Sequence, residues 1–262
     1  MGKVLRVAVT VDLSERVAVV TGGTRGVGAG ITRAFLEAGA RVVICARRPP
    51  EKPFGDAEFV SVDLRDPDAT GAFFRQVGET YGRLDVLVNN AGGSPYRLLG
   101  EVPAVRHARV VELNLIAPLN ASLAAYELMS RQPGGGAIVM IGSVSGTRPS
   151  PGTAAYGAAK AGLENLARSM AVEWAPLVRV NTVVVGMVRT ELSHLHYGDE
   201  AGIAAVGRTV PLGRLADPDE VGDACVYLAS DRARYISGAA LQVHGGGERP
   251  AFLDAATANK EA

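Results

Sequence analysis

The sequence has few cysteines, few aromatic residues and no net charge. Its 262 residues include two cysteines and 5% aromatic residues, and 27 basic residues balance 27 acidic ones. Equal numbers of the two signs create no overall field, so nothing favours a nucleic acid or a membrane surface as a partner. Cys45 and Cys225 lie in separate apolar runs and form no closely spaced metal motif. We therefore expect no bound metal and two buried thiols in a reducing compartment.

Long hydrophobic runs are missing as well. No apolar run reaches the length that crosses a membrane, and the opening "MGKVLRVAVTVD" lacks the continuous apolar region of a signal peptide. These absences predict a cytoplasmic protein. The chain is nevertheless 47% hydrophobic, so its length can bury one large core, which favours a single domain.

Short apolar runs rich in β-branched residues alternate with longer segments of helical spacing. Such strands, hydrophobic throughout and separated by helices, indicate a parallel sheet covered on both faces. The predicted fold is α/β, a single Rossmann-like domain with a doubly wound parallel sheet of about seven strands and helices on both faces. Ligands of such sheets bind at the carboxyl ends of the strands. The expected strands are 16–21, 41–46, 57–62, 84–89, 137–142, 178–185 and 240–244, and the expected helices are 26–38, 67–81, 104–131, 154–175 and 217–230.

The ends of the chain have weaker patterns than its centre. We expect an N-terminal extension over residues 1–11, a catalytic domain over 12–247 and a C-terminal tail over 248–262. Residues 189–213 form the longest connection without a clear element. A long connection at the ligand-binding edge of a sheet predicts a substrate lid.

A glycine-rich turn, "TGGTRGVG" from Thr21 to Gly28, joins the first strand to the first helix. Glycines there let the backbone approach a pyrophosphate, which then lies against the free N–H groups of the helix. The spacing differs from the G-x-G-x-x-G fingerprint, so a turn without a ligand stays an alternative. Its position between a strand and a helix favours the phosphate site.

The second strand ends in "CARR", with Ala46 followed by Arg47 and Arg48. An acidic residue at this point would bind the ribose hydroxyls of NAD, and none is present. Two guanidinium groups, together with Arg25 of the glycine turn, suit a 2′-phosphate. The sequence therefore favours NADP(H) over NAD(H), although NAD(H) and merely solvated arginines stay as alternatives.

Polar residues follow the fourth, fifth and sixth strands, where a ligand would bind. "VNNAGG" ends the fourth strand, "IGSVSG" places Ser143 after the fifth, and "GMVRT" places Thr190 after the sixth. Each could instead serve a turn or a helix cap. Asn114 lies in an apolar helical stretch, where a structural hydrogen bond is as good an interpretation as catalysis.

A tyrosine and a lysine stand four residues apart in the predicted helix 154–175. Lys160 is one of only four lysines, against 23 arginines. Residues one turn apart share a face, so Lys160 can place a cation beside Tyr156. A nearby cation lowers the pKa of a tyrosine from about 10 toward the operating pH. The ammonium could also donate to a cofactor ribose, although a Tyr-x-x-x-Lys pair by itself also arises by chance.

Taken together and in this order, these residues resemble the short-chain dehydrogenase/reductase family over about Asp12 to Gly247. The matching positions are Thr21-Gly22-x-x-x-Gly26-x-Gly28, Asp63, Asn89-Asn90-Ala91-Gly92, Asn114, Ser143, Tyr156-x-x-x-Lys160 and the segment from Gly186 to Thr190.

The resemblance implies a role for each catalytic residue. Tyr156 is expected to be the general acid/base, and Ser143 to orient and polarise the substrate carbonyl. Lys160 is expected to lower the tyrosine pKa and hold the ribose, and Asn114 to anchor a water in the proton relay. The implied cofactor-binding residues are Gly22, Thr24, Arg25, Gly26, Val27, Gly28, Arg47, Arg48, Asp63, Leu64, Asn90, Ala91, Gly92, Tyr156, Lys160, Gly186, Val188 and Thr190.

The expected function is an NADP(H)-dependent oxidoreductase that interconverts a ketone and a secondary alcohol of small size. Alternatives are an NAD-dependent secondary-alcohol dehydrogenase, a 3-oxoacyl thioester reductase and a dinucleotide-binding regulator without turnover. The turn "EWAPLVR" has Ala-Pro-Leu where carrier-protein reductases tend to have a basic residue, which disfavours the thioester. The family resemblance also implies a homotetramer, or a homodimer, formed through the two long helices and the last strand.

Overall fold

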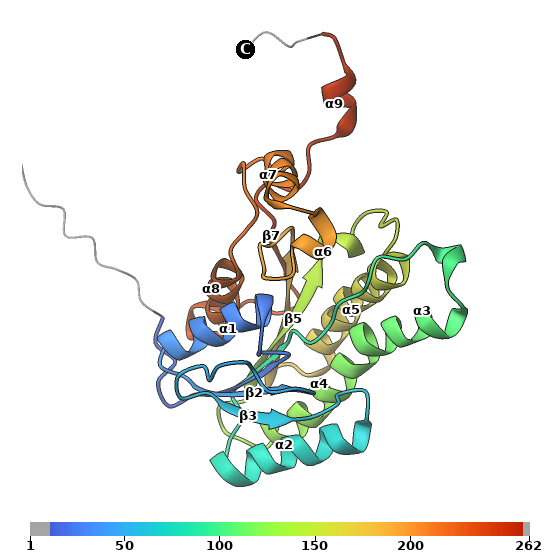
Figure 1. The fold of residues 1–262 in the computed structure, drawn as a ribbon. Coiled ribbons are helices and arrows are strands. Elements are labelled where there is room, and N and C mark those ends of the chain that lie inside the picture. Colours follow the sequence, from blue (N-terminus) through green and yellow to red (C-terminus); the bar gives the residue numbers. More distant parts are fainter. Residues whose placement is uncertain (1–10, 259–262) are drawn as a thin grey trace, which may run out of the picture.

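Seven parallel strands form one sheet in the order β3-β2-β1-β4-β5-β6-β7 (Figure 1). This computed structural model describes residues 11–258, so residues 1–10 of the expected N-terminal extension lie outside the described residues. The order reverses beside β1, where connections leave toward both faces of the sheet and create a ligand-binding crevice. The predicted fold is thus confirmed. The strands are β1 (Val17–Thr21), β2 (Arg41–Ala46), β3 (Glu58–Ser61), β4 (Val86–Asn89), β5 (Gly136–Ser143), β6 (Val178–Val185) and β7 (Ala240–Val243).

Helices cover both faces of this sheet. On one face lie α1 and α8, and on the other lie α2, α4 and α5 (Figure 1). The described helices are α1 (Gly26–Glu37), α2 (Pro67–Tyr81), α3 (Ala104–Val111), α4 (Ala117–Met129), α5 (Ala154–Glu173), α6 (His194–Tyr197), α7 (Glu200–Thr209), α8 (Pro218–Ala229) and α9 (Ala251–Ala255).

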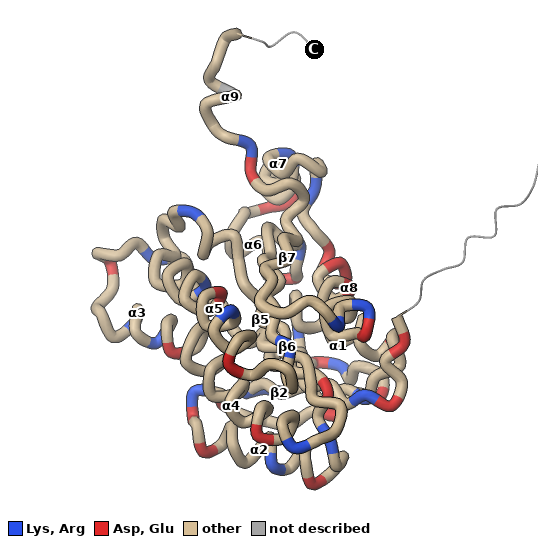
Figure 2. Tube along the Cα trace, turned by 180° about the vertical axis from the view of Figure 1, so that it is seen from behind, with Lys and Arg blue, Asp and Glu red and all other residues tan. Residues whose placement is uncertain are grey.

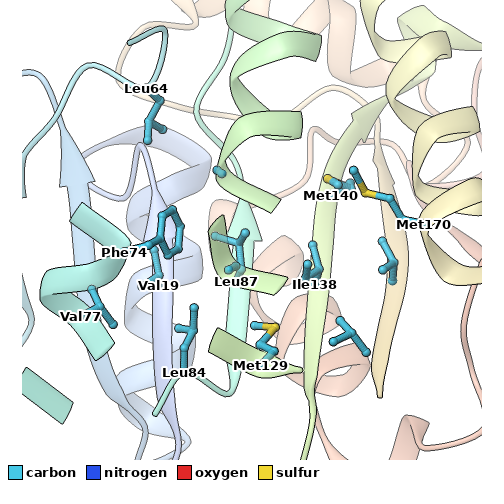
Figure 3. Close-up of a cluster of buried hydrophobic side chains, with 14 of the residues drawn as sticks. Val19, Leu64, Phe74, Val77, Leu84, Leu87, Met129, Ile138, Met140 and Met170 are labelled. Carbon is cyan, nitrogen blue, oxygen red and sulfur yellow. The ribbon is translucent and has the colours of Figure 1, made fainter. Parts of the chain in front are cut away.

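Alternation along each strand divides the core between the two helical layers. Successive strand residues point to opposite faces, so a buried strand needs apolar residues at every position. In β1, Val19 packs with the cluster under α2, α4 and α5, whereas Val20 packs with the cluster under α1 and α8. Figure 3 shows the first cluster, where Phe74 of α2 and Met129 of α4 lie against the sheet. Both cysteines are buried and free, as expected, and burial raises the pKa of Cys45 to about 12.

Two segments differ from the helices and loops expected from the sequence. The predicted helix 104–131 is continuous but contains a π-helical turn at Glu112–Ile116, between α3 and α4. The expectation that residues 189–213 lack a clear element is wrong, because α6 and α7 lie within them. Asp199 caps α7 by accepting the Gly202 N–H at 2.9 Å. In the sequence this N-cap residue lies between Gly198 and Gly202, which obscures the start of the helix. The expected tail contains the short helix α9, which lies away from the sheet (Figure 1).

Charge and hydropathy fit the composition. In the trace of Figure 2, Lys and Arg residues are interspersed with Asp and Glu residues. Among residues 11–258, no helix is long and apolar enough to cross a membrane. Those residues also contain no group of three or more His, Cys, Asp or Glu side chains placed to hold a metal ion.

The two helices that flank the glycine turn cross each other at glycines. A Cβ atom added to Gly30 of α1 would lie 2.3 Å from the backbone carbon of Pro218, the first residue of α8. A Cβ on Gly222 of α8 would lie 2.7 Å from Cβ of Ala34. The missing side chains therefore set how closely α1 approaches α8, and with it the position of the turn that precedes α1.

We predict that Gly30→Ala destabilises the protein. The new methyl group would push α1 from α8, and such overpacking costs about 1–3 kcal/mol. Gly71→Ala is the matched control, because the added Cβ would meet only the flexible Arg75 side chain within 4 Å. Higher helix propensity should then stabilise Gly71→Ala by about 0.5–1 kcal/mol. Urea unfolding measures both changes, and equal effects of the two substitutions would contradict the packing role of Gly30.

Candidate active site

The glycine turn between β1 and α1 brings two stretches of backbone unusually close. Gly22 and Gly26 have positive φ angles of 64° and 53°. A Cβ on Gly28 would lie 2.1 Å from the carbonyl oxygen of Gly22, so no larger residue fits. The Asn90 side chain donates to the carbonyl oxygens of Thr21 at 2.9 Å and Gly22 at 3.1 Å, which fixes the turn from β4.

The N-terminus of α1 is open to an anion. Arg25 occupies the N-cap position without a side-chain hydrogen bond to the helix, and the first turn contains no acidic residue. The N–H groups at the start of a helix then have no protein partner and favour a negative group. The close-approach turn and this uncapped helix together fit the pyrophosphate of a dinucleotide.

The rim expected to bind a 2′-phosphate is basic and accessible. The side chains of Arg25, Arg47 and Arg48 are all exposed, and within the described chain none of the three forms a salt bridge. Asp63, expected near adenine, is instead bound by a residue that the sequence did not single out. Arg65 Nε donates to Asp63 Oδ1 at 2.9 Å and lowers the pKa of Asp63 to about 2, with a smaller contribution from Arg47.

Asn114 lies in the π-helical turn, with its side chain fully buried. Its Oδ1 accepts the Gly93 N–H at 2.9 Å, and its Nδ2 donates to the carbonyl oxygens of Gly93 at 3.0 Å and Val110 at 2.9 Å. The structural hydrogen bond left open by the sequence is therefore present. The amide clamps the loop after β4, where a Cβ on Gly92 would lie 2.5 Å from Asn114 Oδ1 and 3.5 Å from Lys160 Nζ.

The serine, tyrosine and lysine come together where β5 ends and α5 begins. Ser143 is the last residue of β5, and its hydroxyl lies close enough to Tyr156 to lower the pKa of that phenol. Lys160 Nζ lies 5.6 Å from the centroid of the Tyr156 ring and donates to the carbonyl oxygen of Ile141 at 2.7 Å. Glycine allows this packing too, since a Cβ on Gly157 would lie 2.6 Å from the carbonyl oxygen of Ser145.

Burial dominates the electrostatics of this pair. It raises the pKa of Tyr156, and the hydrogen bond from Ser143 only partly opposes the rise. It also lowers the pKa of Lys160 to about 8. Lys160 is not among the groups that shift the pKa of Tyr156, so the lowering of this pKa by Lys160 stays a prediction from the sequence. The phenol holds its proton at neutral pH, which suits a proton donor.

The segment after β6 brings the remaining predicted residues to the same edge. The Gly186 N–H donates to the carbonyl oxygen of Val243 at 3.0 Å, and Val188 forms a β-bridge with Ala216. A Cβ on Gly26 would lie 3.5 Å from Thr190 Cγ2, so Thr190 faces the glycine turn. The segment after β6, which leads into residues 189–213, therefore lies against the glycine turn.

Comparison with known proteins agrees with this geometry. The family model described as "Enoyl-(Acyl carrier protein) reductase" matches residues 22–248. The 3-oxoacyl-[acyl-carrier-protein] reductase FabG of Vibrio cholerae is 35% identical over 242 residues, which cover 90% of this chain and 98% of that protein. The cis-4-hydroxycyclohexanecarboxylate dehydrogenase of Sinomonas cyclohexanicum is 38% identical over 248 residues, covering 89% and 96%. The structure of Thermoplasma acidophilum aldohexose dehydrogenase superposes with a TM-score of 0.86 at 30% identity, covering 90% and 95%.

The chain belongs to the short-chain dehydrogenase/reductase family. It is an oxidoreductase of the class that acts on CH–OH or C=O groups with NAD(P)(H). The family and the enzyme class predicted from the sequence are confirmed. The names of these relatives specify different substrates, so kinship alone leaves the substrate open.

We predict that the charge of Lys160 makes the stability of the protein depend on pH. Its pKa is about 8 in the folded protein, whereas an unfolded lysine has a pKa of about 10.4. Between these values Lys160 binds more protons in the unfolded chain, so this residue contributes a rise in the unfolding free energy of up to about 1.4 kcal/mol per pH unit, against the fall that the buried thiols contribute as the unfolded cysteines ionise. Lys160→Met should lose this rise, as measured by urea unfolding from pH 7.5 to 10.

Tyr156→Phe is the control for that measurement. It removes only a hydroxyl and keeps the buried ammonium, so the rise with pH should persist in this variant. Identical pH dependence in wild type and Lys160→Met would show that Lys160 does not titrate in this range in the folded protein.

Proposed function

We propose that the protein is an NADP(H)-dependent oxidoreductase that interconverts a ketone and a secondary alcohol. The observation that supports this most is the cluster of Ser143, Tyr156 and Lys160 at the carboxyl edge of the sheet, beside an uncapped helix N-terminus. A regulator that only binds the dinucleotide would not need a buried proton donor next to a hydroxyl and an ammonium.

The bound coenzyme would supply or accept the hydride. In the direction of reduction, the Tyr156 hydroxyl donates its proton to the substrate oxygen, and the Ser143 hydroxyl donates a hydrogen bond to the same oxygen. Lys160, whose Nζ lies 5.6 Å from the centroid of the Tyr156 ring, stabilises the phenolate that remains. Asn114 holds the loop after β4 beside Lys160 through three hydrogen bonds to the backbone. The proposed role of Asn114 in binding a water of the proton relay is additional to these bonds.

The residues proposed to hold the coenzyme line one edge of the sheet. The glycine turn and the start of α1 would bind the pyrophosphate, Lys160 the ribose, and the segment after β6 the carboxamide. Asp63 and Leu64 would border the adenine. The full set is Gly22, Thr24, Arg25, Gly26, Val27, Gly28, Arg47, Arg48, Asp63, Leu64, Asn90, Ala91, Gly92, Tyr156, Lys160, Gly186, Val188 and Thr190.

We predict that Tyr156→Phe loses turnover while still binding NADPH. Removal of a general acid typically lowers the rate by about 10²–10⁴-fold, whereas the coenzyme contacts of the backbone are unchanged. Steady-state kinetics with a reducible ketone and NADPH fluorescence titration measure the two effects. Full activity in Tyr156→Phe would refute the proposed proton donor, and NADPH binding without turnover in wild type across a broad carbonyl panel would favour the regulator.

We predict that Arg47→Gln weakens NADPH binding by about tenfold, because a charge-assisted contact to the 2′-phosphate is lost. The dissociation constant of NADH should change little, since NADH lacks that phosphate. Arg41→Gln is the matched control. Arg41 is the first residue of β2, so it lies at the opposite end of this strand from Arg47. Equal weakening of NADPH and NADH would contradict the proposed preference and leave the NAD-dependent enzyme as the better candidate.

A 3-oxoacyl thioester reductase is the second candidate, favoured by the similarity to FabG. The loop Ala175–Pro176–Leu177 after α5 offers no basic side chain to an acidic carrier protein. Initial rates of NADPH consumption with simple ketones and with 3-oxoacyl thioesters distinguish the two substrates.

We also propose that the chain forms a homotetramer, with a homodimer as the alternative. Exposed apolar residues on the long helices support this, notably Leu123 of α4 at 50% and Val172 of α5 at 80% exposure. Single apolar residues at such exposure gain from being covered by a second copy.

A further inference from the structure

Three segments that are distant in sequence meet at one ion pair beside the active site. Arg148 lies in the loop between Ser143 and Tyr156, and Glu248 follows β7 at the start of the C-terminal tail. Arg148 Nη2 lies 2.5 Å from Glu248 Oε1, and the two side chains are 39% and 38% exposed. Tyr197, at the end of lid helix α6, is half-buried and lies within electrostatic range of both charges.

The far end of the lid rests on the same tail segment. The Leu212 N–H donates to the carbonyl oxygen of Gly245 at 3.1 Å. A Cβ on Gly245 would lie 2.6 Å from Val210 Cγ1, and a Cβ on Gly246 would lie 2.9 Å from Pro211 Cβ. The backbone of the tail thus packs directly on residues 210–212, where the lid ends.

Three consecutive glycines turn the tail back toward Arg148. Gly245, Gly246 and Gly247 have positive φ angles of 64°, 96° and 87°, a region that other residues rarely adopt. This turn follows β7 directly and places Glu248 at the loop of Arg148. The four residues from Gly245 to Glu248 therefore contact the end of the lid and, through Glu248, the loop of Arg148 between Ser143 and Tyr156.

We propose that the Arg148–Glu248 ion pair is a latch that holds the lid, residues 189–213, closed over the substrate site. Arg148 and Glu248 are positioning residues, because they act on the substrate through the lid and the tail. The role rests on the proposed function, since it assumes that the carbonyl substrate binds behind the lid. The alternative is an exposed ion pair that contributes nothing to lid position, as is common for surface pairs.

Limited proteolysis tests the latch without requiring activity. Thermolysin cleaves beside apolar residues, such as Leu195 and Leu212 of the lid, and is insensitive to the loss of an arginine. An exposed ion pair contributes little, so Arg148→Gln and Glu248→Gln should each raise the cleavage rate within 189–213 by about 1.5- to 5-fold. The wild-type rate should rise toward that of the variants in 1 M NaCl, where the screening length falls to about 3 Å.

Arg33→Gln is the matched control, because it breaks an exposed pair between α1 and α8, Arg33 Nη2 to Asp219 Oδ1 at 2.6 Å. The doubly exchanged variant, Arg148→Glu with Glu248→Arg, should restore at least half of the lost protection. If both single variants are cleaved no faster than Arg33→Gln, the latch is overturned. If the exchanged variant stays as susceptible as the single ones, the effect belongs to lost packing, and the latch is again overturned.

Kinetics separate the latch from the proposed reaction. Each single variant should raise the KM of the ketone by about 1.5- to 5-fold with kcat within twofold of wild type, and the NADPH dissociation constant should not change. A fall in kcat with unchanged KM would overturn the positioning role. If wild type shows no turnover, the proposed function fails, while the proteolysis result still decides whether the lid is latched.

Discussion

The burial of Lys160 is the constraint on which the site depends. Lys160 is 3% exposed, and its ammonium lies near the Tyr156 ring and donates a hydrogen bond to the carbonyl oxygen of Ile141. No carboxylate contributes to the shift of its pKa to about 8. A buried ammonium without a carboxylate partner destabilises the folded protein. The surrounding backbone must therefore pack closely enough to keep Lys160 in this position. A buried lysine can lose its proton, whereas an arginine at this position could not. This difference explains why a chain that otherwise prefers arginine has a lysine here.

Close backbone approach is the means by which the rest of the structure holds this group. Gly92 leaves room for both Asn114 Oδ1 and Lys160 Nζ, and Gly157 lets the loop after β5 lie on the first turn of α5. The π-helical turn then places the Asn114 amide against the loop after β4, where its three hydrogen bonds fix the backbone. Glycines and one widened helical turn thus bring three strand ends within reach of one another.

Sequence patterns predicted the features that neighbouring residues determine. They missed the features that depend on contacts between distant parts of the chain. Helix α2 begins at Pro67 and ends at Tyr81 as expected, because Asp66 caps it and Gly82 ends it with a positive φ. The strand ends and the Tyr156–Lys160 face followed from the periods of the sheet and the helix. The Arg148–Glu248 pair spans 100 residues of sequence, and no period or spacing connects those positions. The rise that burial causes in the pKa of Tyr156 likewise depends on packing from several elements.

The site combines a rigid part, at the carboxyl ends of the strands, with a weakly held part, residues 189–213. Parallel strands buried on both faces fix Tyr156, Lys160 and the glycine turn, and relatives with differently named substrates are similar to this chain over about 90% of its length. In the proposed latch, residues 189–213 are held by contacts of another kind: an exposed ion pair, one backbone hydrogen bond at 3.1 Å and glycines that allow residues 210–212 to pack on the tail. Interactions of this strength break at little cost, so a lid held in this way would open for a substrate while the buried residues stay in place. Substrate choice is therefore best sought in residues 189–213 and their partners on the tail, where a change of side chain leaves the buried edge intact.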